Sequence, residues 1–212
     1  GDWSSDVCSS DLLLPPTVST DLTLTAGVDY LMEGRVTVGN GNGQLETNGD
    51  GTLSDGSSVR NVTLTIEAGV NVFGKSGTFA NLVITRGSKL MAVGTKSAPI
   101  VFSSDDEGLD GSGEWGGLII HGYAPHNECA EGGSYCDIDS EGESGFAGGY
   151  HPDDSSGVLR YVVVAEGGYE FSTGNEINGI SLVGVGSGTE MDYIQVHGNS
   201  DDGIEFYGGN VN

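Results

Sequence analysis

Basic residues are scarce in this sequence, and their scarcity excludes several classes of partner. The chain carries 7 lysine and arginine residues against 31 aspartate and glutamate residues, for a formal net charge of −24. From Ser97 to Asn212, Arg160 is the only basic residue among 21 acidic ones. Such an acidic surface repels nucleic acid and anionic membranes, so we expect no nucleic-acid partner, whereas divalent cations are attracted.

Long apolar runs and helical periodicity are also missing. No run approaches the roughly 20 apolar residues that cross a bilayer as a helix, so we expect no transmembrane segment. The chain instead alternates short runs of aliphatic and β-branched residues with Gly, Asn, Ser and Asp. Such runs include residues 62–66, 82–85, 90–93, 100–102 and 118–120. Together with 38 glycines, this texture predicts short strands separated by tight turns.

The first twelve residues, GDWSSDVCSSDL, do not resemble a protein segment. Reverse translation of residues 2–12 fits the read-two adapter of a common short-read sequencing platform, so we interpret residues 1–12 as an adapter-derived artefact of metagenomic assembly. We expect residues 13–19 to be an unstructured leader and residues 20–212 to be a single domain. Because the chain stops directly after a strand-like run, we expect it to be truncated at both ends, with any signal peptide lost.

Cysteine is rare, and one of the three cysteines, Cys8, lies in the adapter-like segment. Cys129 and Cys136 remain, seven positions apart in a segment rich in Gly and Glu. This spacing suits a disulfide that closes a surface loop, although two free thiols or a metal-binding pair are alternatives. A disulfide would indicate an oxidising location, either extracellular or on the outer cell surface.

An internal repeat decides the predicted fold. Residues 175–182 (NEINGISL) align with residues 199–206 (NSDDGIEF), and a weaker copy around Gly157 precedes them. Copies separated by one solenoid turn predict an all-β, right-handed parallel β-helix, with an acidic loop insertion at about 122–157. The alignment also predicts two stacked columns. They contain positions 153, 175 and 199, and positions 156, 178 and 202.

Several segments resemble a family of exported bacterial β-helix proteins. These are residues 115–125 (WGGLIIHGYAP), 156–162, 175–180, 184–189 and 199–209. Members of this largely uncharacterised family are often lipoproteins or secretion substrates. The resemblance implies the fold and export but assigns no catalytic residue. Members are often labelled multidrug transporters, and no feature of this sequence supports that label.

Two acidic segments are candidates for calcium binding. The first, DIDSEGE at 137–143, places carboxylates at every second position before a glycine, like the first half of a calcium loop. Gly148 stands where such a loop needs a bidentate glutamate, so this is no EF-hand. The metal candidates are Asp137, Asp139, Glu141 and Glu143, with Asp105, Asp106 and Asp110 in the second segment beside Glu107 and Glu114. The alternative is a pair of solvated acidic loops.

Enzymatic candidates are fewer. A glycoside hydrolase needs two carboxylates on one face, and Asp201 or Asp202 could pair with Glu205 or Asp192. Neighbouring residues of an extended chain point to opposite sides, so only one of the two aspartates could do so. His197 is the nearby candidate for proton transfer, although a lone histidine more often packs or donates a hydrogen bond. A lyase commonly needs a basic residue, and the acidic half offers only Arg160.

Aromatic residues gather around the insertion, and aromatic faces stack on sugar rings. Trp115, Tyr123 and Tyr150 are therefore candidate ligand-binding residues, unless they only cover the flank beneath the insertion. We favour a secreted or cell-surface module that binds polysaccharide or mediates adhesion without catalysis, with calcium ordering its acidic loops. The alternatives are a polysaccharide lyase or glycoside hydrolase, and a purely structural surface scaffold.

Overall fold

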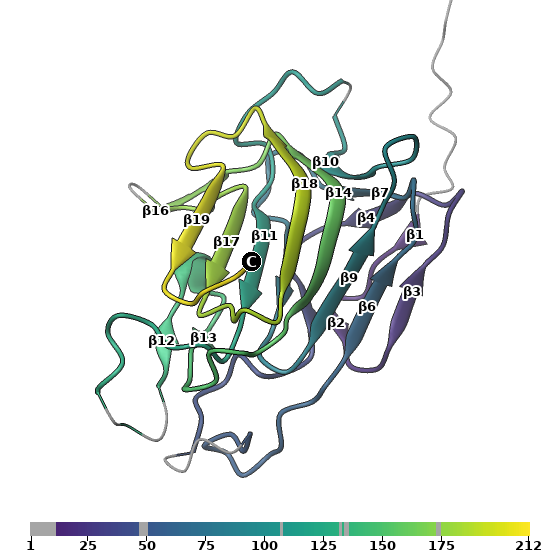
Figure 1. Ribbon diagram of the computed structural model, residues 1–212. Coiled ribbons are helices and arrows are strands. Elements are labelled where there is room, and N and C mark those ends of the chain that lie inside the picture. Colours follow the sequence, from purple (N-terminus) through teal and green to yellow (C-terminus); the bar gives the residue numbers. More distant parts are fainter. Residues whose placement is uncertain (1–11, 47–50, 107, 132, 134–135, 173–174) are drawn as a thin grey trace, which may run out of the picture.

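The chain forms a parallel β-helix, as predicted (Figure 1). The computed structural model describes residues 12–46, 51–106, 108–131, 133, 136–172 and 175–212. Five complete turns of the solenoid, which we call rungs 1 to 5, follow two leading strands. In Figure 1 the rungs follow one another from the purple strands β1–β3 to the yellow strands β18 and β19.

Each rung has three sides, which we call sides I, II and III. Side I contains β3 (Leu22–Leu24), β6 (Thr63–Ile66), β9 (Lys89–Val93) and the first halves of β14 (Gly157–Ala165) and β18 (Glu190–His197). Side II contains β1 (Leu12–Leu13), β4 (Tyr30–Met32), β7 (Asn71–Gly74), β10 (Ile100–Ser104) and the second halves of β14 and β18. Side III contains β2 (Thr17–Val18), β5 (Val36–Val38), β8 (Asn81–Ile84), β11 (Gly117–His121), β17 (Ile180–Val183) and β19 (Ile204–Tyr207).

Alternate residues of these strands point inward and stack from rung to rung. One column of side I consists of Leu24, Ile66, Ala92, Leu159 and Met191, which pair in parallel register. The first four are at most 1% exposed, and Met191 packs against the same core. Because each short run contributes inward residues at a spacing of two, the runs read from the sequence become one continuous apolar core.

The three vertices, where the chain turns from one side to the next, differ in length. The candidate site residues lie mostly in or beside the loops at these vertices. The vertex between sides III and I carries long excursions at 39–62 and 122–156. The second of these contains β12 (Ile138–Asp139), the 3₁₀ turn η1 (Glu141–Glu143) and β13 (Phe146–Ala147), with β12 and β13 antiparallel. The vertex between sides II and III carries loops at 105–116 and 166–179. The second loop contains the antiparallel strands β15 (Glu170–Ser172) and β16 (Asn175–Glu176).

The vertex between sides I and II is a turn of several residues in rungs 1 to 3 and a single residue in rungs 4 and 5. In rungs 1 and 2 it is a turn that contains Gly27 at φ 81° or Gly69 at φ 83°. In rungs 4 and 5 a single residue inside a continuous strand makes the corner, Tyr161 at φ 50° and Tyr193 at φ 55°. Both tyrosines lie in the left-handed region, which favours glycine.

The N-terminal expectation needs correction. Residues 13–19 are not an unstructured leader, because Thr17–Val18 pairs with β5 and the side chains of Leu14 and Val18 are buried. Residues 1–11 of the adapter-like segment lie outside the described residues, and Leu12 already pairs with Tyr30. No helix in the described ranges has the length and apolar character needed to span a membrane.

One part of the predicted stacking is confirmed. Ile180 pairs with Ile204, and the Gly179 N–H donates to the Asp202 carbonyl. The glycines at 179 and 203 therefore lie side by side in rungs 4 and 5, and positions 178 and 202 are neighbours.

The other predicted column members are wrong. Gly157 pairs with Leu90 on side I, so positions 153 and 156 do not continue the columns of side III. Position 175 lies in β16, inside the excursion at 166–179, and not beside position 199. The Ser200 N–H donates to the Gly167 carbonyl. Position 199 therefore lies beside residue 167.

Candidate functional site

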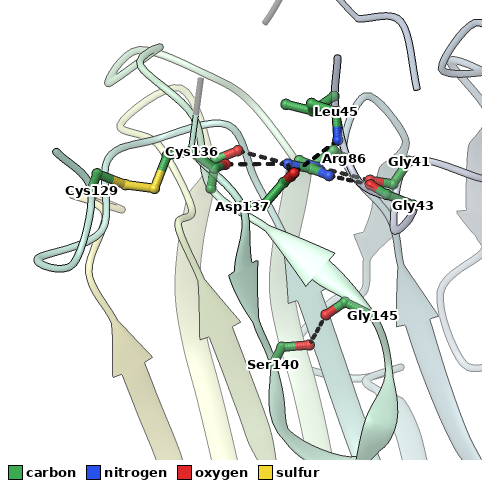
Figure 2. A network of polar contacts seen from close by, with 10 residues as sticks. Gly41, Gly43, Leu45, Arg86, Cys129, Cys136, Asp137, Ser140 and Gly145 are labelled. Atoms are coloured by element: carbon green, nitrogen blue, oxygen red, sulfur yellow. Dashed lines mark hydrogen bonds and ion pairs between the residues drawn. A yellow bond between two sulfur atoms is a disulfide. The ribbon is translucent and has the colours of Figure 1, made fainter. Parts of the chain in front are cut away.

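The 122–156 insertion covers the outer surface of side III and is held there by a buried arginine. Arg86 lies two residues after the end of β8 and is 0% exposed. Its guanidinium lies between two excursions of the III–I vertex (Figure 2). It donates hydrogen bonds to the carbonyl groups of Gly41, Gly43, Cys136 and Gly148.

The charge of Arg86 is matched by Asp137. Arg86 Nη1 lies 2.8 Å from Asp137 Oδ1, and Asp137 Oδ2 accepts the N–H of Leu45 at 2.9 Å. Burial lowers the pKa of Arg86, and the hydrogen bond and charge of Asp137 oppose that shift. The ion pair and its hydrogen bonds to Gly41, Gly43 and Leu45 therefore join the 39–62 loop to the insertion (Figure 2).

A second arginine holds the other end of the insertion. Arg35 donates from Nε to Asn81 Oδ1 at 3.1 Å and from Nη1 to the Glu143 carbonyl at 2.7 Å. Its Nη2 donates to the Gly142 carbonyl. Two of the seven basic side chains of the chain thus fasten one loop, so they are unavailable for an anionic ligand.

The insertion also buries a histidine. His121 ends β11 with its side chain 0% exposed, and its Nε2 lies 2.9 Å from Ser140 Oγ and 3.2 Å from Ser144 Oγ. Its Nδ1 has no hydrogen-bond partner among the described residues. Burial, followed by the positive charges of Arg86 and Arg35, lowers the pKa of His121 from 6.5 to about 3. The imidazole is therefore neutral near pH 7 and cannot donate a proton as an imidazolium.

The predicted disulfide is confirmed. Cys129 and Cys136 are bonded, with their Cα atoms 5.4 Å apart. Because Cys136 also offers its carbonyl to Arg86, the disulfide loop is tied to the anchored part of the insertion.

The calcium candidates of the insertion do not form one set. Asp137 is occupied by Arg86 and Leu45, Asp139 is exposed on β12, and Glu143 is exposed at φ 53°. The Glu141 side chain lies outside the described residues.

The second acidic segment lies at the II–III vertex. Asp105 accepts the Ser76 N–H at 2.6 Å, Asp106 and Asp110 are exposed, and Glu107 lies outside the described residues. Across the described ranges, no three His, Cys, Asp or Glu side chains are placed to hold a metal ion together. Calcium binding stays a prediction.

The proposed catalytic carboxylates are held separately. Asp201 and Asp202 are exposed at the II–III vertex. Glu205 Oε2 accepts hydrogen bonds from Asn178 Nδ2 and the Tyr207 hydroxyl on the outer surface of side III. No hydrogen bond of the described residues joins these three carboxylates to one another.

The remaining catalytic candidate, His197, is engaged with the loop at 105–116. Its Nε2 lies 2.9 Å from the Leu109 carbonyl oxygen, so the ring donates there to a backbone group. The structure thereby brings together two segments that the sequence separates, residues 105–116 and 197–202, which meet at the II–III vertex. It does not bring His197 into a hydrogen bond with Glu205.

The aromatic candidates serve packing and anchoring. Trp115 is 0% exposed, and its indole N–H donates to the Ala165 carbonyl at 2.7 Å, so its prediction as a ligand-binding residue is wrong. The ring of Tyr123 lies 5.7 Å from the Arg86 guanidinium, and the Tyr150 hydroxyl donates to the Ala130 carbonyl. Tyr123 and Tyr150 therefore help to hold the insertion.

A different aromatic pair faces solvent. Tyr161 and Tyr193 stack with ring centroids 4.3 Å apart and an interplanar angle of 3°, and Tyr193 is 62% exposed. We call this pair the aromatic vertex. The strands that carry the pair, β14 and β18, are neighbours (Figure 1), and both tyrosines lie where these strands turn from side I to side II. A left-handed conformation costs a non-glycine residue about 1–3 kcal/mol, and such outliers cluster at functional sites.

Charged and apolar residues flank the aromatic vertex. Arg160 lies 3.3 Å from Glu190 and 3.9 Å from Asp192, measured between nitrogen and carboxylate oxygen. Val93, which pairs with Arg160 in rung 3, is 43% exposed. Exposed rings beside an aliphatic side chain and a polar rim form a surface that can bind the apolar face of a sugar.

Comparison with known families agrees with this architecture. The family model of the pectate-lyase-like β-helix domain matches residues 43–212. The chain belongs to this family. The matched region of this pectate-lyase-like domain includes the insertion, the disulfide and the aromatic vertex. Comparisons with curated proteins and with solved structures each found no match.

Proposed function

We propose that the chain is a noncatalytic polysaccharide-binding module of an exported protein, and that the aromatic vertex is its contact surface. The observation that carries this proposal is the stacked pair of Tyr161, which is partly exposed, and Tyr193, which is exposed, both in the left-handed region. In rungs 1 and 2 the same vertex is a longer turn in which glycines, Gly27 and Gly69, take the positive φ, so a left-handed residue at this vertex need not be tyrosine. The strained conformation of the two tyrosines is therefore explained by a function of their rings and not by the need to turn the chain.

The absence of catalysis is supported by the hydrogen bonds and ion pair that already engage the candidate acid and base side chains. Glu205 is held by Asn178 and Tyr207, His197 by a backbone carbonyl, and Asp137 by Arg86. Acid–base catalysis needs groups that converge on one substrate atom, and these side chains lie on different parts of the solenoid. Binding needs only the exposed surface.

Export and calcium belong to the same proposal. The Cys129–Cys136 disulfide suits an extracellular or outer cell-surface location. A calcium ion would have to use carboxylates other than Asp137, which is already paired. Calcium added to the metal-free protein should then raise the denaturation midpoint equally in the wild type and in a variant already lacking the Asp137 carboxylate, Asp137→Asn.

Removing the tyrosine rings is the test of binding. Tyr161→Gly and Tyr193→Gly should each weaken polysaccharide binding about tenfold or more, since each removes half of the stacking surface. Glycine adopts the φ of these positions without strain, so the vertex should keep its fold. Affinity electrophoresis through gels that contain neutral or acidic polysaccharides measures the retardation, and urea unfolding checks the fold.

Phe79→Ala is the matched control, because Phe79 is 44% exposed and packs against Phe171 away from the aromatic vertex. It should leave retardation unchanged. Equal loss in Phe79→Ala and in the tyrosine variants would contradict the proposed surface. A release of reducing sugars that disappears in Asp201→Asn or Asp202→Asn would contradict the noncatalytic assignment.

A further inference from the structure

We infer that the aromatic vertex is also a site of oxidative modification, at which Tyr161 and Tyr193 couple to form an intramolecular dityrosine cross-link. The inference rests on the geometry of the two rings and is independent of polysaccharide binding. The oxidant is a one-electron oxidising system, such as a peroxidase with hydrogen peroxide.

The distance between the rings favours this reaction. The centroids of Tyr161 and Tyr193 are 4.3 Å apart and the ring planes differ by 3°, so the two phenol rings are stacked with their faces in contact. The strands that carry them are paired on both sides of the corner, at Arg160 with Asp192 and at Val162 with Ile194. The two rings are therefore kept together by the backbone, which raises the local concentration of one phenol around the other.

Solvent access satisfies the second requirement. Tyr193 is 62% exposed, so a diffusing oxidant or a peroxidase surface can reach the ring. The other described tyrosines are less accessible: Tyr30 is buried, and Tyr123, Tyr150, Tyr161, Tyr169 and Tyr207 are partly buried. The stacked pair is the only aromatic contact between two tyrosines among the described residues.

The reaction balances without any further cofactor. Each tyrosine loses one electron and its hydroxyl proton, which gives two phenoxyl radicals. A carbon–carbon bond forms between the ring positions next to the hydroxyl groups, and the two displaced ring hydrogens return to the oxygens. One hydrogen peroxide accepts the two electrons and two protons and leaves as two waters. The cross-linked protein is lighter by two hydrogen atoms.

The cross-link would join rung 4 to rung 5 covalently. β18 is paired with β14 along both of its halves, and β19 follows β18 in rung 5. A bond between positions 161 and 193 closes a loop that contains the 166–179 excursion, and loop closure reduces the freedom of the unfolded chain. The oxidised protein should therefore unfold at a higher urea concentration than the untreated protein.

The experiment treats the purified chain, at low concentration, with peroxidase and one equivalent of hydrogen peroxide. Wild type should gain dityrosine fluorescence as a monomer, and proteolysis should give a cross-linked peptide pair containing Tyr161 and Tyr193, lighter by two hydrogens. Tyr193→Phe keeps the ring and the stacking but lacks the phenol, so it should lose at least nine-tenths of this signal. Tyr207→Phe is the matched control and should behave as wild type.

Two outcomes would overturn the inference. One is the absence of dityrosine in wild-type monomers under conditions that oxidise free tyrosine in the same tube. The other is a cross-link that persists in Tyr193→Phe or maps to different tyrosines. Because the readout is chemical, a failure to bind polysaccharide would leave this result unaffected, and the two proposals fail separately.

Discussion

Replacing Arg86 with methionine is expected to lower the free energy of unfolding by about 3–5 kcal/mol, the usual cost of removing one partner of a buried ion pair. Arg86→Met leaves the Asp137 side chain, 10% exposed, without its counter-ion. It also leaves the carbonyl groups of Gly41 and Gly43 without their donor. Urea unfolding followed by circular dichroism measures the change.

Arg160→Met is the matched control for this prediction. Arg160 also forms ion pairs, but its side chain is 41% exposed, and exposed pairs contribute about 0–1 kcal/mol. Arg86→Lys keeps the charge but cannot donate to both excursions at once, so its cost should be intermediate. If Arg86→Met cost no more than Arg160→Met, the insertion would not depend on the buried arginine.

Acidification is expected to destabilise the protein through His121. Its pKa is 6.5 in the unfolded chain and about 3 in the folded protein, so the unfolded state binds more protons between these values. Stability is therefore complete above pH 6.5 and falls as the pH decreases toward 3. From pH 6.5 to about pH 4.5, the loss due to His121 should be about 2.3 kcal/mol.

The pH prediction has its own pair of variants. His121→Gln can still accept or donate a hydrogen bond near Ser140 but does not titrate, so the loss between pH 6.5 and about 4.5 should largely disappear. His151→Gln removes an exposed histidine and should keep the wild-type dependence. An equal acid sensitivity of His121→Gln and wild type would show that another group controls the stability.

The sequence was informative about the fold because the fold repeats local features. Each side requires a short apolar run that forms a strand, and each vertex requires glycine and polar residues that form a turn. The repeat placed Gly179 beside Gly203 because both precede a strand of side III. It failed at Gly157, which precedes a similar apolar run but pairs with Leu90 on side I, since local similarity does not identify the side.

The candidate site was less accessible from the sequence for a physical reason. The contact between Tyr161 and Tyr193 depends on the length of the 166–179 excursion and on the conformation of single corner residues, and neither follows from the pattern of residue types. Trp115 was expected at the surface because it lies near the insertion, yet its ring fills the core. The anchoring role of Arg86 depends on loops that meet only in the folded protein.

The most direct measurement of the central claim is a titration of the protein, labelled with ¹³C in its tyrosine rings, with soluble polysaccharide fragments. The chain has eight tyrosines, and Tyr161→Phe and Tyr193→Phe each remove one tyrosine ring signal and thereby assign it. If the aromatic vertex binds polysaccharide, the Tyr161 and Tyr193 signals should shift and saturate, and those of the buried Tyr30 should stay unchanged. Binding that leaves both vertex signals unmoved would contradict it.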